Sequence, residues 1–126
     1  MKYTLIAALL FLNVSLYAQT SPLDTIPGDI VGGKNAWIKF LRQNIVPDTP
    51  VMNGARPGKY TVVISFLVDT AGNISDVRLE EDPGYGTGAD VLHAFTHPPL
   101  WTPATVEGKP VMYRHKKEVV YQVEKF

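Results

Sequence analysis

Residues 59–81 read KYTVVISFLVDTAGNISDVRLEE, and this stretch decides the fold. Its first part alternates, with one face made of Tyr60, Val62, Ile64, Phe66 and Val68. A period of two is that of a β-strand, here one with a strongly apolar face. Residues 69–73, DTAGN, supply turn chemistry, and apolar residues resume behind them at Ile74, Val77 and Leu79. The stretch therefore predicts a β-hairpin whose first strand is the most buried element of the protein.

A helix is predicted on each side of this hairpin. Residues 36–44, AWIKFLRQN, place Trp37, Phe40 and Leu41 on one stripe. Asn35 stands where a side-chain oxygen can cap the helix, and Pro47 disfavours helical geometry just before it, so we expect the helix to end near Ile45.

The second helix is expected to begin near Gly88 or Ala89, after a glycine-rich loop at residues 82–88. Thr87 and Asp90 have the spacing of a capping box. Val91, Leu92 and Phe95 then give the helix a buried face, which ends before the two prolines at 98 and 99.

Residues 111–126 are predicted to form the last strand, with a bulge or twist where Lys116, Lys117 and Glu118 interrupt the alternation. Trp101 is expected in the core, and residues 47–58 in a loop. The predicted fold class is α+β, with two helices packed on one face of a three-stranded antiparallel sheet, in the order α-β-β-α-β. We expect the first hairpin strand at the centre of the sheet, between the second and the last.

The beginning of the chain resembles a secretory signal peptide, with Lys2, an apolar run at residues 5–12 and Ala18 at the cleavage position. The predicted organisation is a signal peptide at residues 1–18, an extended lead-in at 19–34 and one domain at 35–126. This predicts residence in the periplasm, or membrane anchoring if the signal is retained.

Charge and cysteine content narrow the function classes. Removing Lys2 from the 12 basic residues leaves 11 against 12 acidic ones, so the balance does not favour a nucleic-acid or anionic-membrane binder. The chain has no cysteine, which excludes thiol nucleophiles and sulfur-ligated metals. Residues 69–90 carry six acids and one base, whereas residues 109–126 carry five bases and two acids.

Catalytic and metal sites find little support in the sequence. None of Ser21, Ser65 and Ser75 lies in a nucleophile elbow. His93 and His97 are four apart on the predicted helix, a spacing that can ligate a metal, but the third ligand stays open among Asp90, Glu107 and His115. The glycines at 84, 86 and 88 match no phosphate-binding pattern. We therefore expect no enzyme, no cofactor and no metal.

The sheet edge remains as the candidate site. A small open sheet offers unpaired N–H and C=O groups at both edges, and an extended peptide can add to such an edge. The last strand is long and basic, although its lysines could equally serve only to prevent aggregation. The predicted protein-binding residues are Arg114, His115, Lys116, Lys117, Glu118, Val119, Val120, Tyr121, Gln122 and Val123.

Several short motifs in order resemble those of the TonB C-terminal domain family. They are the WTPA of residues 101–104 with the GKPV of 108–111, the FLVDTAGNI of 66–74, and the paired glycines at 32–33 that precede FL at 40–41 and NI at 44–45. The match extends over residues 30–126 and is similar to stand-alone, secreted forms common in Bacteroidetes-like envelopes. The resemblance implies the same fold, a periplasmic location, and binding of a TonB-box-like peptide of an outer-membrane receptor, or of another envelope protein, by β-augmentation on the last strand.

Two alternatives to this hypothesis remain. One is a self-associating envelope protein, such as a homodimer through strand edges. The other is an energy transducer that keeps its N-terminal anchor. The resemblance begins about a dozen residues after position 19, and an extended chain reaches at most ~3.5 Å per residue, so this stretch is too short to cross a periplasm.

Overall fold

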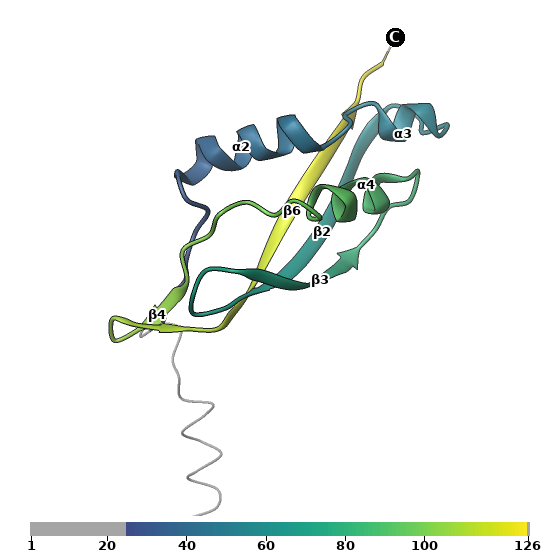
Figure 1. Cartoon of the computed structure of the whole chain (residues 1–126). Coiled ribbons are helices and arrows are strands. Elements are labelled where there is room, and N and C mark those ends of the chain that lie inside the picture. Colours follow the sequence, from purple (N-terminus) through teal and green to yellow (C-terminus); the bar gives the residue numbers. More distant parts are fainter. Residues whose placement is uncertain (1–24, 126) are drawn as a thin grey trace, which may run out of the picture.

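The computed structural model describes residues 25–125, which form an α+β domain with two three-stranded antiparallel sheets (Figure 1). The predicted signal peptide lies outside the described residues. The elements in chain order are β1 (Thr25–Ile26), α2 (Gly33–Asn44), α3 (Thr49–Met52), β2 (Gly58–Val68), β3 (Ile74–Glu81), α4 (Thr87–Ala94), β4 (Ala104–Val106), β5 (Lys109–Val111) and β6 (Tyr113–Val123). Within residues 25–125, no helix is long and apolar enough to span a membrane.

The main sheet has the strand order β3-β2-β6, so the first hairpin strand is central as predicted. Both of its pairings are antiparallel. The alternation in β2 becomes one fully buried row, with Val62, Ile64, Phe66 and Val68 all at 0% exposure. This row supplies the floor on which the helices pack.

Helices α2 and α4 cover the same face of this sheet, as the sequence predicts (Figure 1). Phe40 of α2, Val91 of α4, and Phe95 just after α4 are buried against the β2 row. The rings of Phe40 and Phe95 meet edge to face, with centroids 5.3 Å apart. Trp101 joins this cluster with 4% exposure, which confirms its predicted place in the core.

Both predicted helix caps are wrong. Helix α2 begins at Gly33 behind Gly32, which has a left-handed backbone, so Asn35 lies inside the first turn. Helix α4 begins at Thr87 behind Gly86, and neither helix has a side-chain cap. A glycine adopts the left-handed geometry without steric cost, so in each case the chain enters the helix one to three residues earlier than polar side chains would indicate.

The predicted C-terminal ends of the two helices agree better with the structure than the predicted starts do. Helix α2 ends at Asn44 and Ile45 is extended, close to the end that Pro47 predicts through its restriction of Val46. Helix α4 ends at Ala94, which leaves His97 outside it. The predicted loop at 47–58 contains the single helical turn α3.

The predicted bulge in the last strand is also wrong. β6 pairs with β2 without a register shift from Val68↔Tyr113 to Gly58↔Val123. The irregularities lie in β3 instead, where its pairing with β2 shifts between Val63 and Ile64 and again between Ser65 and Leu67. The cluster of lysines in β6 reflects alternation between two faces and does not interrupt the ladder.

A second, smaller sheet closes one end of the domain. It has the order β1-β4-β5, and an isolated bridge joins Ile30 to Trp101 nearby. The hairpin turn between β2 and β3 packs against the same segment: Gly72 has φ +86°, and a Cβ added there would collide with the carbonyl oxygen of Trp101. Gly72 is therefore required both by its backbone conformation and by the close approach of Trp101.

We expect Gly72→Ala to lower the free energy of unfolding by about 2–4 kcal/mol, because the substitution combines a left-handed alanine with a backbone collision. Gly108→Ala is the matched control, since Gly108 has φ +78° but open space around it. The Gly108→Ala substitution should lower the free energy of unfolding by only about 1 kcal/mol. Urea denaturation measures both values, and equal losses would contradict the role of the Trp101 contact.

Candidate functional site

Strand β6 forms one edge of the main sheet. All eleven of its residues pair with β2 on one side, and no strand among residues 25–125 pairs with it on the other. In an antiparallel ladder, alternate residues direct their N–H and C=O groups to opposite sides of the strand. About half of the backbone groups of β6 are therefore available for a further strand.

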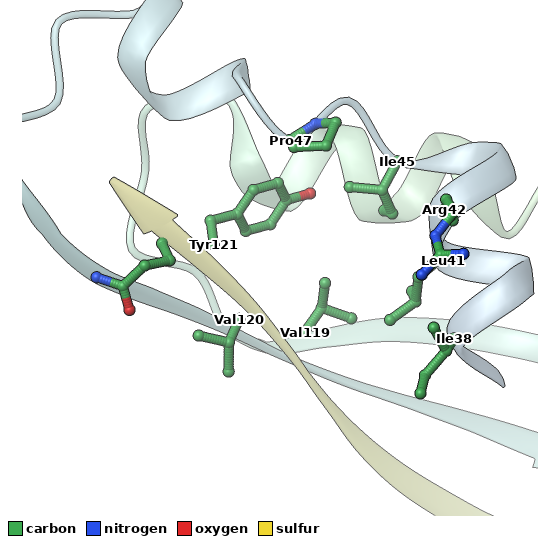
Figure 2. A pocket seen from close by; sticks show the side chains of 9 residues that line it. Ile38, Leu41, Arg42, Ile45, Pro47, Val119, Val120 and Tyr121 are labelled. Carbon is green, nitrogen blue, oxygen red and sulfur yellow. The ribbon is translucent and has the colours of Figure 1, made fainter. Parts of the chain in front are cut away.

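An apolar groove of about 390 Å³ runs between this edge and helix α2 (Figure 2). Helix α2 and the segment after it provide one wall, and residues 119–122 of β6 provide the other. The lining residues are Ile38, Leu41, Arg42, Ile45, Pro47, Val119, Val120, Tyr121 and Gln122. Ile38 and Val120 are 40% and 49% exposed, so the groove presents apolar surface to solvent.

A second hollow of about 300 Å³ continues the groove toward the end of β6. It shares Pro47 and Gln122 with the first. Val51 of α3 and Val123 add apolar surface, whereas Asp48 and Glu124 add acidic groups. The two hollows together follow β6 over the length of several residues of an added strand.

A hydrogen-bonded hub under the groove holds its two walls together. The Tyr121 hydroxyl donates to the Asp90 carboxylate over 2.7 Å. The same carboxylate oxygen accepts from the Val46 N–H at 3.0 Å and the Thr49 hydroxyl at 3.3 Å. Burial, together with the neighbouring Asp90 carboxylate, raises the pKa of Tyr121, so the phenol stays protonated and remains a donor.

Asp90 therefore does not close a capping box, as its spacing from Thr87 predicted. The Thr87 hydroxyl donates to the Gly84 carbonyl instead. The partners of Asp90 lie 31 to 44 residues away in the chain, which no local spacing reveals.

Lys117 lies at the edge of β6 on the side that faces the helices. It pairs with Ile64, a member of the buried β2 row, which fixes the direction of its side chain. Its ammonium is 5.2 Å from the centre of the Trp37 ring and 5.8 Å from that of Trp101. Cation–π attraction therefore holds the ammonium over the two indoles.

Arg114 is engaged on the opposite, open face of the sheet. Its guanidinium forms an ion pair with Asp76 in β3 and donates to the Ser65 hydroxyl at 2.9 Å. Ser65 in turn donates to Glu80 at 2.6 Å, and Arg78 also pairs with Asp76 at 2.8 Å. This network fastens β6 to β3 across the central strand.

His115 is buried in an aromatic cluster below Lys117. Its ring stacks on Phe66 and meets Trp101 and Tyr113 edge to face. Among the described residues its Nε2 has no hydrogen-bond partner. Burial, with a smaller contribution from the Lys117 charge, lowers the pKa of His115.

The ten residues of the predicted binding segment thus fall into four groups, one of which is Lys117 alone, over the two indoles. Residues 119–122 line the main groove and Val123 the second hollow. Arg114 and His115 are engaged with other strands, and Lys116 and Glu118 are exposed on the open face. Sequence reasoning missed the helix wall of the groove and the Asp90 hub.

The histidines and glycines considered for metal or phosphate binding are not assembled into a site. His93 and His97 are exposed and do not share a helix, because α4 ends between them. The part of the chain from 25 to 125 contains no group of three or more metal-ligating side chains. At the start of α4, the Asp82 carboxylate accepts from the Gly84 N–H at 2.9 Å and lies against Gly88, where a phosphate would have to bind.

No protein-family model matches this chain, and no curated protein matches it. Among solved structures, the chain is similar to the TonB C-terminal domain of Pseudomonas aeruginosa, determined by solution NMR. The two are 26% identical over 61% of this chain and 78% of the other, with a TM-score of 0.44. The assignment of the site rests on its own geometry.

We expect Tyr121→Phe to lower the free energy of unfolding by about 1–3 kcal/mol, because it removes a donor from a carboxylate that is partly buried. Tyr60→Phe is the control, since its hydroxyl donates to the exposed Arg56 carbonyl and should be worth less than about 1 kcal/mol. Urea denaturation of both variants measures these values. If Tyr121→Phe lowers the free energy of unfolding no more than Tyr60→Phe does, the hydrogen bond to Asp90 does not stabilise the fold as proposed.

Stability should fall as the pH drops below about 6.5, because the unfolded chain then takes up a proton that the buried His115 resists. The contribution of neutral His115 to the free energy of unfolding is complete above the pKa of histidine in the unfolded chain, and it is lost progressively as the pH falls below that pKa. His115→Phe removes this titration while keeping an aromatic ring, and should flatten the pH dependence of urea unfolding between about pH 7 and pH 5. His93→Gln, at an exposed position of α4, is the control, and parallel profiles for wild type and His115→Phe would contradict the assignment.

Proposed function

We propose that this chain is a periplasmic protein-binding module that takes an extended segment of a partner as an additional strand along β6. The observation that carries this proposal is the regular, eleven-residue edge of β6 beside an apolar groove. Backbone hydrogen bonds from the edge would supply affinity that does not depend on sequence. The groove would supply selectivity by accepting alternate side chains of the added strand.

The geometry favours an added strand over a folded partner surface. The groove lies beside β6, and its walls come from the strand itself, from α2 and from the segment after α2 (Figure 2). Side chains on one face of an added strand would point toward Leu41 and Ile45, while those on the other face would lie over the open side of the sheet.

The motif resemblance to the TonB C-terminal domain family supports the class of partner. We propose a TonB-box-like segment of an outer-membrane receptor, or an equivalent segment of another envelope protein. The signal-peptide pattern at residues 1–18 supports a periplasmic location, and participation in TonB-dependent transport across the outer membrane follows from the same resemblance.

Self-association is the second candidate, and the same open edge favours it. The β6 edges of two copies could pair around a two-fold axis. Sedimentation of the protein without peptide at high concentration distinguishes the two functions: a monomer supports the module, and a dimer that peptide does not dissociate supports self-association.

Titration of ¹⁵N-labelled protein with a capped synthetic peptide, in which threonines alternate with one glutamate and two valines, tests the proposal. We expect amide shifts concentrated in β6 and in the facing side of α2. Ile38→Glu should weaken binding by about tenfold or more, because a charge replaces apolar surface in the groove.

Leu92→Glu is the matched control. The sequence predicts Leu92 on the buried face of this helix, but it is 37% exposed on α4 and lies outside the groove. The variant should bind the peptide as the wild type does. Shifts confined to other elements, or equal weakening by the two variants, would overturn strand addition at β6.

A further inference from the structure

We propose that the Lys117 ammonium recognises a carboxylate on the added segment and thereby sets its register along β6. This inference rests on the proposed function, because it assigns a specificity-determining residue to the same edge. It goes further in naming the chemistry that the partner must present and the position at which it must present it.

The side chain of Lys117 lies on the same face of β6 as the residues that line the groove. Alternation along β6 puts Lys117 on the same face as Val119 and Tyr121, which line the groove. Lys116 and Glu118, its neighbours in sequence, are on the opposite face. An added strand would therefore meet Lys117 and the apolar groove with one and the same row of side chains.

The ammonium is held in place without being neutralised. The Trp37 and Trp101 rings restrict it from below at 5.2 and 5.8 Å, and an aromatic ring carries no net charge. The residue is half-buried, so part of its hydration is already lost. Among residues 25–125 the ion pairs join Asp76 to Arg78 and to Arg114, and no carboxylate pairs with Lys117.

Fixing the ammonium in advance favours binding of a carboxylate. A lysine on a free surface loses rotamer entropy when it forms an ion pair, which is one reason such pairs contribute little. At Lys117 the stacking over two indoles has already restricted the side chain. A carboxylate of the partner would then gain the Coulomb attraction with a smaller entropic cost.

The charges at the two ends of the groove differ in sign. Lys117 lies one alternate position before Val119, next to one end of the groove, and Asp48 and Glu124 line the second hollow at the other end. Arg42, an exposed residue in the last turn of α2, is the remaining cation along the main groove. The complementary segment carries a carboxylate opposite Lys117, apolar side chains at the next alternate positions, and no acid at the far end.

The test uses the glutamate peptide described above and two versions of it in which glutamine or lysine replaces the glutamate. Dissociation constants are measured by fluorescence anisotropy, and amide shifts confirm that each complex forms at β6. For the wild type, replacing glutamate by glutamine should weaken binding by about fivefold. Lys117→Glu should reverse the preference, so that the lysine peptide binds more tightly than the glutamate peptide.

Three further variants separate charge recognition from structural effects. Lys117→Met keeps an aliphatic chain over the indoles and should lose the preference for glutamate, whereas Lys117→Arg should keep it. Lys116→Glu is the matched control, since it makes the same charge change one residue away on the opposite face, and it should keep the glutamate preference.

The outcomes distinguish this inference from the proposed function. A glutamate preference that persists in Lys117→Glu, or that is lost in Arg42→Gln instead, overturns the role of Lys117 while strand addition stands. If the wild type binds all three peptides with equal affinity, the role of Lys117 is likewise overturned while strand addition stands. Absence of binding and of β6 shifts with every peptide overturns the proposed function itself, and this inference with it.

Discussion

The structure depends on the double pairing of β2. This strand is hydrogen-bonded along both sides and carries the fully buried row from Val62 to Val68. Its two neighbours are distant from one another in sequence and are not paired with each other, so both strands take their register from β2. The helices pack on its row, and the last strand owes its whole length and straight register to it. The consequence for function is indirect: a central strand with two neighbours leaves β6 with one side unpaired.

That unpaired side is held rigidly from two directions. On the helix face, Tyr121 reaches the Asp90 carboxylate, which also holds the backbone at Val46. On the open face, Arg114 reaches across β2 to Asp76. Both interactions use charged groups that are partly withdrawn from water, where hydrogen bonds contribute more than at a free surface. An edge held in this way presents its backbone groups in a fixed geometry, which lowers the entropy cost of adding a strand.

The sequence predicts the sheet order, the buried row and the covering helices, because these follow from periodicity. It fails at the helix starts, where glycines with left-handed backbones at 32 and 86 replaced side-chain caps. It also places the bulge in the wrong strand, because charge clusters and ladder irregularities look alike in one dimension. The candidate site is predicted only as a strand. Its second wall depends on where Ile38 and Pro47 come to lie relative to β6, which is a tertiary property. The side of β6 on which Lys117 lies could have been predicted from the sequence, since Lys117, Val119 and Tyr121 occupy alternate positions of the strand and therefore the same face.

The two register shifts in β3 have a consequence for assembly. A sheet with two regular edges can join head to tail with copies of itself, and such contacts propagate into open filaments because nothing closes them. Here β6 is regular over its full length, whereas β3 is interrupted twice within eight residues. The sheet therefore offers one regular edge for extension, at β6, and one irregular edge, at β3. Two copies that pair through β6 would leave only their irregular β3 edges outside, which disfavours further growth of the sheet into fibres.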